Sequence, residues 1–123
     1  MALLAGGAVT AAWLSPLRAD SARGERVFLR CVACHSVARG EDRLPGPSLR
    51  GVMGRRAGTL PGFRFSPALI DAGGRGVVWG RETLDAFLAD PEGFIPGTVM
   101  GPPGLREADD RRDVIDFLER RTP

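Results

Sequence analysis

Two cysteines and the only histidine of the chain stand close together, in the segment Cys31-Val32-Ala33-Cys34-His35. On a helical turn, thiols three positions apart lie on one face, with the imidazole beside them. C-x-x-C-H is the motif through which a c-type haem is attached, and its histidine can ligate the iron. The motif occurs once, so we expect one haem c, bound through Cys31 and Cys34, and a chain of 123 residues must fold around it.

Three other uses of the cysteine pair fit the sequence less well. A structural zinc site needs four ligands, and the chain has no cysteine or histidine besides Cys31, Cys34 and His35. A thioredoxin-like redox pair needs a βαβ setting, and no such pattern surrounds the motif. A plain disulfide is geometrically poor at this spacing. The motif therefore favours covalent haem attachment.

The iron needs a second axial ligand, and a second histidine is excluded because His35 is the only one. Methionine is a common partner in cytochromes, where it raises the reduction potential. Met1 lies in an apolar leader, and Met53 is expected to fill a gap in the core. Met100 lies in a stiff loop rich in proline and glycine, residues 95–102, which can lie across the open haem face. We therefore predict His35 and Met100 as the iron ligands.

Length and composition predict one small helical domain. The chain is 43% hydrophobic and 26% charged, which is typical of a globular protein. Its 17 glycines and 10 prolines are too many for a plain helical bundle. The 17 basic residues, all arginine, are mixed with 15 acidic ones, which argues against a nucleic-acid partner. We expect an all-α fold of four to five helices, joined by long Gly/Pro-rich loops around the haem.

Capping residues, apolar spacing and the charges at helix ends mark four helices. The predicted helices run from Ala22 to Cys31, from Ser66-Pro67 to just before Gly73, from Arg81 to Ala89, and from Glu107 to Arg120. The segments 36–65 and 91–104 are expected to be loops. The only strand-like run is the short segment 76–79.

The N-terminal segment from Met1 to Leu17 carries no charge and is rich in alanine and glycine. Its length matches the apolar core of an export signal, cleaved after Ala19, although the usual basic flank is missing. About 17 residues is also the lower limit for a membrane anchor. A third interpretation is an apolar tail whose upstream start is missing. In each case the folded domain is expected over residues 20–123, and residues 1–19 are assigned as a signal peptide or N-terminal anchor.

An ordered set of motifs resembles the class I c-type cytochromes, and within them mitochondrial cytochrome c and its soluble bacterial relatives. The resemblance covers residues 24–120. Its segments are, in order, Gly24-x-x-x-Phe28, the haem motif, Gly46-Pro47 through Ala57-Gly58, Pro61-Gly62-Phe63, Trp79, and Pro96-Gly97-Thr98-x-Met100. The resemblance implies the class I cytochrome c fold, with the first and last helices crossing at Gly24 and Phe28.

The resemblance also implies roles for single residues around the haem. The Pro47 carbonyl would accept a hydrogen bond from the free ring nitrogen of His35, which orients the imidazole and raises its basicity. Arg55 would bind a haem propionate by a charge-assisted hydrogen bond. The indole N–H of Trp79 would be a second propionate donor.

One departure from the family concerns its tyrosines. Phe65 and Phe87 stand where tyrosines are common, and the chain contains no tyrosine. The hydrogen bonds that those hydroxyl groups make to a propionate, and near the methionine sulfur, are therefore missing or replaced. Ser66 is the residue that we expect to replace one of them, so we include it among the haem-binding residues.

The resulting function is a one-electron carrier, not an enzyme, that shuttles electrons between respiratory or other redox complexes. Two alternatives remain open. A haem-enzyme subunit with an open iron site would need an absent or labile Met100, and a membrane-tethered electron-entry module of an oxidase or dehydrogenase would differ only in its anchor. We expect a monomer in the periplasm, free or anchored by its N-terminal segment, that docks transiently with redox proteins at the haem edge.

Overall fold

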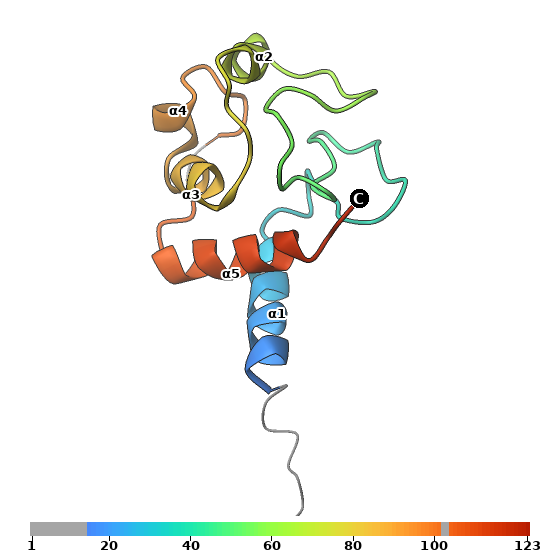
Figure 1. The fold of residues 1–123 in the computed structure, drawn as a ribbon, viewed down its shortest axis with the longest axis vertical. Coiled ribbons are helices and arrows are strands. Elements are labelled where there is room, and N and C mark those ends of the chain that lie inside the picture. Colours follow the sequence, from blue (N-terminus) through green and yellow to red (C-terminus); the bar gives the residue numbers. More distant parts are fainter. Residues whose placement is uncertain (1–14, 102–103) are drawn as a thin grey trace, which may run out of the picture.

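Among the described residues, five α-helices and long connecting loops make up the fold (Figure 1). The structure is a computed structural model, and it describes residues 15–101 and 104–123. The helices are α1 (Ser15–Phe28), α2 (Pro67–Gly74), α3 (Arg81–Ala89), α4 (Pro91–Phe94) and α5 (Ala108–Glu119). Within the described residues, the only β pairing is an isolated bridge between Arg56 and Val78. The predicted all-α fold is confirmed.

Helix α1 differs from its prediction at both ends. It begins at Ser15 rather than at Ala22, with Pro16 in its first turn, where proline is tolerated, and the good helix formers Leu17, Arg18 and Ala19 directly after it. It ends at Phe28 rather than at Cys31, and single turns continue from there. The amide of Cys31 donates to the Phe28 carbonyl at 2.8 Å, and the amide of His35 donates to the Cys31 carbonyl at 2.8 Å. The predicted haem motif therefore lies on turns just after the helix.

Three further helices follow their sequence signals closely. Helix α2 starts at Pro67, and Ser66 caps it by accepting a hydrogen bond from the amide of Leu69 at 3.3 Å. It continues to Gly74 instead of ending before Gly73. The predicted bounds of α3 are confirmed, and those of α5 are correct to within one residue at each end.

The segment predicted as a loop from residue 91 to 104 contains the short helix α4, so this part of the prediction is wrong. The cause is local. Asp90 accepts a hydrogen bond from the amide of Gly93 at 3.1 Å, and Pro91 occupies the first helical position. The helix ends at Phe94, and Ile95, which follows it, is 1% exposed. A single helical turn therefore precedes the loop that carries Met100.

Helices α1 and α5 cross where Gly24 leaves no side chain between them (Figure 1). A Cβ atom on Gly24 would overlap the carbonyl oxygen of Asp113 and the Cβ of Phe117. The rings of Phe28 and Phe117 lie 5.2 Å apart between centroids. The Asp113 side chain is buried and lies 3.4 Å from the Nε of Arg23. This crossing, which the resemblance implied, holds the haem motif in place because the motif follows directly on α1.

The long loop between α1 and α2 is tied to the segment that precedes α3. The amide of Gly54 donates to the Trp79 carbonyl at 2.7 Å, and the amide of Trp79 donates to the Arg55 carbonyl at 2.8 Å. A further bond joins the amide of Ala57 to the Val77 carbonyl at 2.9 Å. These bonds close the loop around a central cavity.

Most of the predicted leader, residues 1–14, lies outside the described residues, so its role stays a prediction. Met1, one of the three methionines considered as a ligand, lies there as well. Helix α1 runs across the expected cleavage point after Ala19. Among the helices of residues 15–101 and 104–123, none is long and apolar enough to cross a membrane.

Candidate functional site

The loops and helices enclose a cavity of about 500 Å³. This volume lies within the usual range of about 300–1,000 Å³ for cofactor and ligand pockets. Side chains from the haem motif, the α1–α2 loop, α3, the Met100 loop and α5 line its walls. Among the described lining residues none is aspartate or glutamate, whereas two are arginine, Arg55 and Arg64. The cavity is thus apolar over most of its wall and carries only positive charge.

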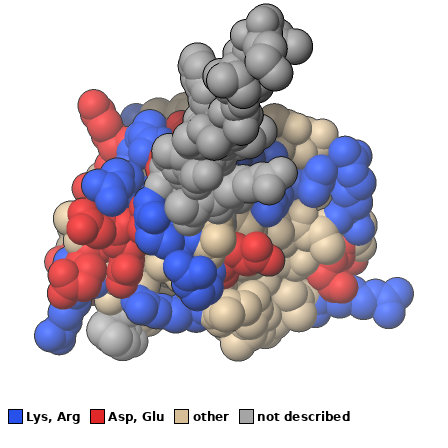
Figure 2. Space-filling model, turned by 90° about the horizontal axis from the view of Figure 1, so that it is seen from below, with Lys and Arg blue, Asp and Glu red and all other residues tan. Residues whose placement is uncertain are grey.

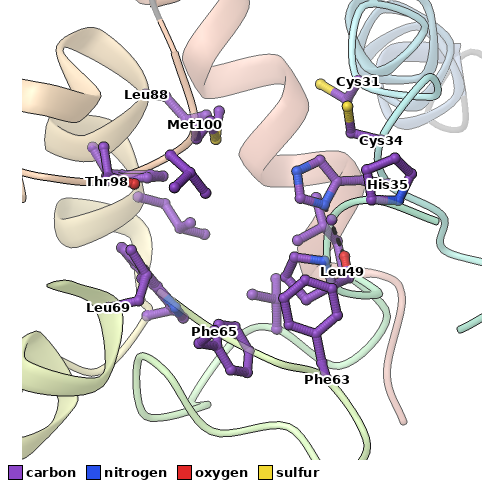
Figure 3. A pocket seen from close by; sticks show the side chains of 18 of the residues that line it. Cys31, Cys34, His35, Leu49, Phe63, Phe65, Leu69, Leu88, Thr98 and Met100 are labelled. Atoms are coloured by element: carbon purple, nitrogen blue, oxygen red, sulfur yellow. Dashed lines mark hydrogen bonds between the residues drawn. The ribbon is translucent and has the colours of Figure 1, made fainter. Parts of the chain in front are cut away.

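Cys31, Cys34 and His35 lie on one side of this cavity, and Met100 lies on the other (Figure 3). The turn after α1 produces the first group, because the amides of Cys34 and His35 both donate to the Cys31 carbonyl, at 3.1 and 2.8 Å. Both cysteines are free thiols, Cys31 partly buried and Cys34 exposed. Burial raises the pKa of the Cys31 thiol, and the nearby Arg30 opposes the shift.

The imidazole of His35 has a fixed orientation. Its Nδ1 lies 2.8 Å from the carbonyl oxygen of Pro47, so Nδ1 donates and Nε2 remains free. Burial lowers the pKa of His35, and the hydrogen bond to Pro47 partly opposes this shift. Gly46 allows its backbone to pack closely against the imidazole ring, because a Cβ at this position would lie 2.5 Å from the ring carbon Cε1 of His35. A neutral, oriented imidazole is the form that ligates a metal.

The structure separates the two described methionines. Met100 is partly buried and lines the cavity opposite His35. Met53 is also partly buried, but it packs against the hydrophobic core and does not line the cavity. A thioether can therefore approach a group held in the cavity only from Met100, among the described residues.

Arg55 and Trp79, the two expected propionate donors, are neighbours in space and both line the cavity. The guanidinium of Arg55 donates to the carbonyls of Ser48 and Arg50, each at 2.7 Å. Burial lowers the pKa of Arg55, but a guanidinium stays charged in proteins. No acidic side chain among the described residues pairs with it, so its charge is available to an anionic group in the cavity.

Two hydroxyl groups also lie in the cavity wall. Ser66 caps α2 through its oxygen and keeps its hydrogen available as a donor. Thr98, two residues before Met100, has a buried Oγ1 without a hydrogen-bond partner in the described structure. A buried hydroxyl of this kind is costly unless a ligand or water satisfies it. The sequence prediction assigned Thr98 no role, although Thr98 belongs to the segment Pro96-Gly97-Thr98-x-Met100 that resembles the family.

The aromatic side chains that replace tyrosine make the wall more apolar. Phe87 is buried and packs against Trp79, with ring centroids 5.1 Å apart. Phe65 is partly buried and meets Phe63 edge-on at 4.7 Å. All four rings line the cavity. Phe65 and Phe87 cannot donate a hydrogen bond, so Arg55, Ser66 and the residues near them make the polar contacts of the site.

The residues of the cavity fit a haem. One wall offers two thiols and an oriented imidazole, the opposite wall offers a thioether, and the remaining polar groups are hydrogen-bond donors suited to carboxylates. The family model for cytochrome c matches residues 21–122. The chain belongs to the cytochrome c family.

Relatives and solved structures agree with this assignment. The chain is 44% identical to cytochrome c type-1 of Ascaris suum over 101 residues, which cover 81% of the chain and 87% of the relative. It is 39% identical to cytochrome c2 of Agrobacterium tumefaciens (strain II Chrys) over 99 residues, covering 80% and 89%. The structure of cytochrome c2 from Rhodospirillum centenum superimposes with a TM-score of 0.79 at 36% identity, covering 85% of this chain and 99% of that one.

Family membership establishes the general function. The chain is a class I c-type cytochrome that binds one covalent haem c with its iron. It is an electron carrier and works with other redox proteins.

Proposed function

We propose that Cys31 and Cys34 attach the haem through thioether bonds, and that His35 and Met100 are the axial ligands of its iron. The placement of His35 and Met100 on opposite sides of one cavity supports this assignment most strongly. The lack of any other described methionine in the wall agrees with it. When bound, the haem supplies the ferrous–ferric couple.

The protein's contribution is to hold both ligands still. Pro47 fixes the His35 ring through the 2.8 Å hydrogen bond and raises the basicity of the ligating nitrogen. Met100 is partly buried in a loop that follows Pro96 and Gly97, while Pro102, which was expected to stiffen its other end, lies outside the described residues. Two protein ligands leave no open position for peroxide, which favours a carrier over an enzyme.

Arg55, Trp79 and Ser66 are proposed to bind the haem propionates. The positive, half-buried Arg55 has no acidic partner among the described residues, and the other two line the same cavity. Carboxylates placed there would receive charge-assisted hydrogen bonds, which are about twice as strong as neutral ones.

The cellular setting is also a proposal. An uncharged N-terminal segment supports export to the periplasm, with residues 1–19 as a cleaved signal or an anchor and residues 20–123 as the haem domain. There, a monomer would carry electrons between respiratory or other redox complexes and dock at the haem edge. Val99, next to Met100, is 83% exposed and lines the cavity, which supports docking at this side.

Intact-mass analysis of the mature protein tests the attachment. After denaturation and acid–acetone extraction, the wild type should retain the mass of one haem. Cys31→Ala combined with Cys34→Ala should release it, whereas the control Met53→Leu should retain it. Haem that extracts cleanly from the wild type would contradict the proposed attachment.

Fractionation of cells, followed by haem staining and N-terminal sequencing, tests the setting. A soluble periplasmic product that begins near Asp20 would support the cleaved signal. A haem-stained membrane product that begins at Met1 would instead support the tethered electron-entry module.

A further inference from the structure

The distribution of acidic residues around the cavity is uneven. Between Asp42 and Asp71 the sequence contains no acidic residue, although it contains five arginines. This stretch includes most of the loop that closes the cavity. Only two of its arginines, Arg55 and Arg64, line the cavity, and no described lining residue is acidic. The wall therefore offers no carboxylate of its own to these two guanidinium groups.

The two cavity arginines differ in how they are held. Arg55 is partly buried, and its two terminal nitrogens donate to backbone carbonyls. Arg64 is exposed and has no ion pair or side-chain hydrogen bond with the described residues. Other exposed arginines are paired with aspartates, as Arg30 is with Asp110 at 3.1 Å and Arg75 is with Asp71 at 3.0 Å.

The residues next to Arg64 in the sequence fix its position relative to the cavity. Phe63 and Phe65, on either side of it, are partly buried in the cavity wall, and their ring centroids lie 4.7 Å apart. Ser66 follows directly and also lines the cavity. Arg64 therefore stands at the rim, beside the hydroxyl that we propose as a propionate donor, where its long side chain has access to both solvent and cavity.

We propose that Arg64 is a second cationic contact for the haem propionates, placed at the rim of the cavity, while Arg55 provides the inner one. This rests on the proposed binding of the propionates near Arg55, Trp79 and Ser66. Two guanidinium groups then match the two carboxylates of one haem. Of the other titratable groups in the wall, His35 is the proposed iron ligand and both cysteines would be thioethers, which leaves Arg55 and Arg64 as the charged groups that would face the propionates.

The contact has two electrostatic consequences. A cation near the haem favours the reduced state, because oxidation adds a positive charge to the iron. A cation near a propionate also keeps that carboxyl ionised to lower pH. Protonation of the propionate removes a negative charge and raises the reduction potential. The potential should therefore rise as the pH falls through the propionate pKa, and Arg64 should place this rise at lower pH.

The experiment is spectroelectrochemical titration of the haem-loaded protein between about pH 4 and pH 8. Arg64→Gln should lower the reduction potential at neutral pH. It should also raise the pH at which the potential begins to rise by about one unit, which is the lower end of the pKa shifts that a nearby opposite charge causes. Arg39→Gln is the matched control, because Arg39 is exposed and does not line the cavity. It removes the same charge and should leave the pH of the rise unchanged.

Arg64→Lys separates charge from loop structure, because lysine keeps the charge on a different head group. It should return most of the shift toward the wild-type value. Equal titrations of Arg64→Gln and Arg39→Gln would overturn the proposal. So would a lysine variant as strongly shifted as the glutamine variant, because the loop and not the charge would then be responsible. The failure of covalent haem attachment in the wild type would instead contradict the proposed function.

Discussion

The crossing of α1 with α5 and the haem cavity lie next to each other but are stabilised in different ways. At the crossing, Gly24, Phe28 and Phe117 pack against one another, and protein atoms fill the contact. Around the cavity, residues such as Leu49 and Phe65 direct part of their apolar surface toward the cavity instead of toward other protein atoms. We therefore expect the crossing to form without the haem, and the loops around the cavity to need the haem for their structure.

The largest expected effect follows from preventing haem attachment. Cys31→Ala combined with Cys34→Ala should leave residues 36–66 without hydrogen-exchange protection, because their apolar side chains lose their main contact. Residues of α1 and α5 near Gly24 should keep part of their protection. Amide hydrogen exchange read by mass spectrometry measures both regions in one sample. Equal loss of protection in the two regions would show that the crossing also depends on the cofactor.

The next largest effect concerns Met100, the proposed axial ligand in the cavity wall. Met100→Ala should abolish the weak long-wavelength sulfur-to-iron band of the ferric protein, lower the potential and allow carbon monoxide to bind. Truncation of a fully buried methionine costs about 2–5 kcal/mol in stability, and because Met100 is only partly buried its truncation should cost less. His35 is the only histidine, and the chain has no lysine or tyrosine, so no such side chain can replace the lost ligand.

Met53→Leu is the control for Met100→Ala, because Met53 lies in the core and outside the cavity wall. A swap that conserves volume costs less than about 1.5 kcal/mol, and the spectrum and potential should stay near those of the wild type. Loss of the band in the Met53 variant would mean that the ligand is wrongly assigned. Peroxide turnover by the wild type would favour the haem-enzyme alternative.

A smaller effect is expected at the crossing itself. Gly24→Ala places a Cβ against the carbonyl oxygen of Asp113, and overpacking of this kind costs about 1–3 kcal/mol. Gly74→Ala is the control, because Gly74 ends α2 and the added Cβ would lie within 4 Å of no other part of the fold. Thermal unfolding of both haem-loaded variants should show a lower midpoint only for Gly24→Ala. Equal midpoints would mean that the helices can separate slightly at no cost.

The sequence predicted best those features that a local pattern of residues marks. The haem motif, the cap at Ser66 and the bounds of α3 are local patterns, and each lies where expected. Helix α4 was missed although Asp90-Pro91 carries the cap signal, because the surrounding prolines and glycines pointed to a loop. Local signals were therefore sufficient for most elements, and their neighbours sometimes obscured them.

The contacts around the cavity depend on residues far apart in the sequence. The backbone pairing of Arg55 with Trp79 brings two predicted propionate donors together, and no local pattern of either segment shows it. The buried, unpaired hydroxyl of Thr98 could be recognised only in three dimensions. The family resemblance supplied the roles of single residues, whereas the structure supplied their distances and partners.

The smallest effect concerns the charges on the protein surface. Arg30 is paired with Asp110, and Arg81 is paired with Asp116 and Glu119. On the face shown in Figure 2, basic and acidic side chains are mixed. The net charge of the chain is only +2. Mixed, paired charges produce little long-range steering, since exposed charges are screened beyond about 8–10 Å near physiological salt.

The oxidation rate of the reduced protein by hexacyanoferrate(III), an anion, should therefore fall by less than about tenfold as salt rises, the lower end of electrostatic steering. Val99→Lys adds a cation beside Met100 and should steepen the fall, because Val99 is 83% exposed and lines the cavity. Val78→Lys adds the same charge at a 42% exposed position outside the cavity wall and should change the slope less. A steep fall of the wild-type oxidation rate with salt would show that the unpaired arginines near the cavity act together. Equal slopes for the two lysine variants would place electron exit away from Met100.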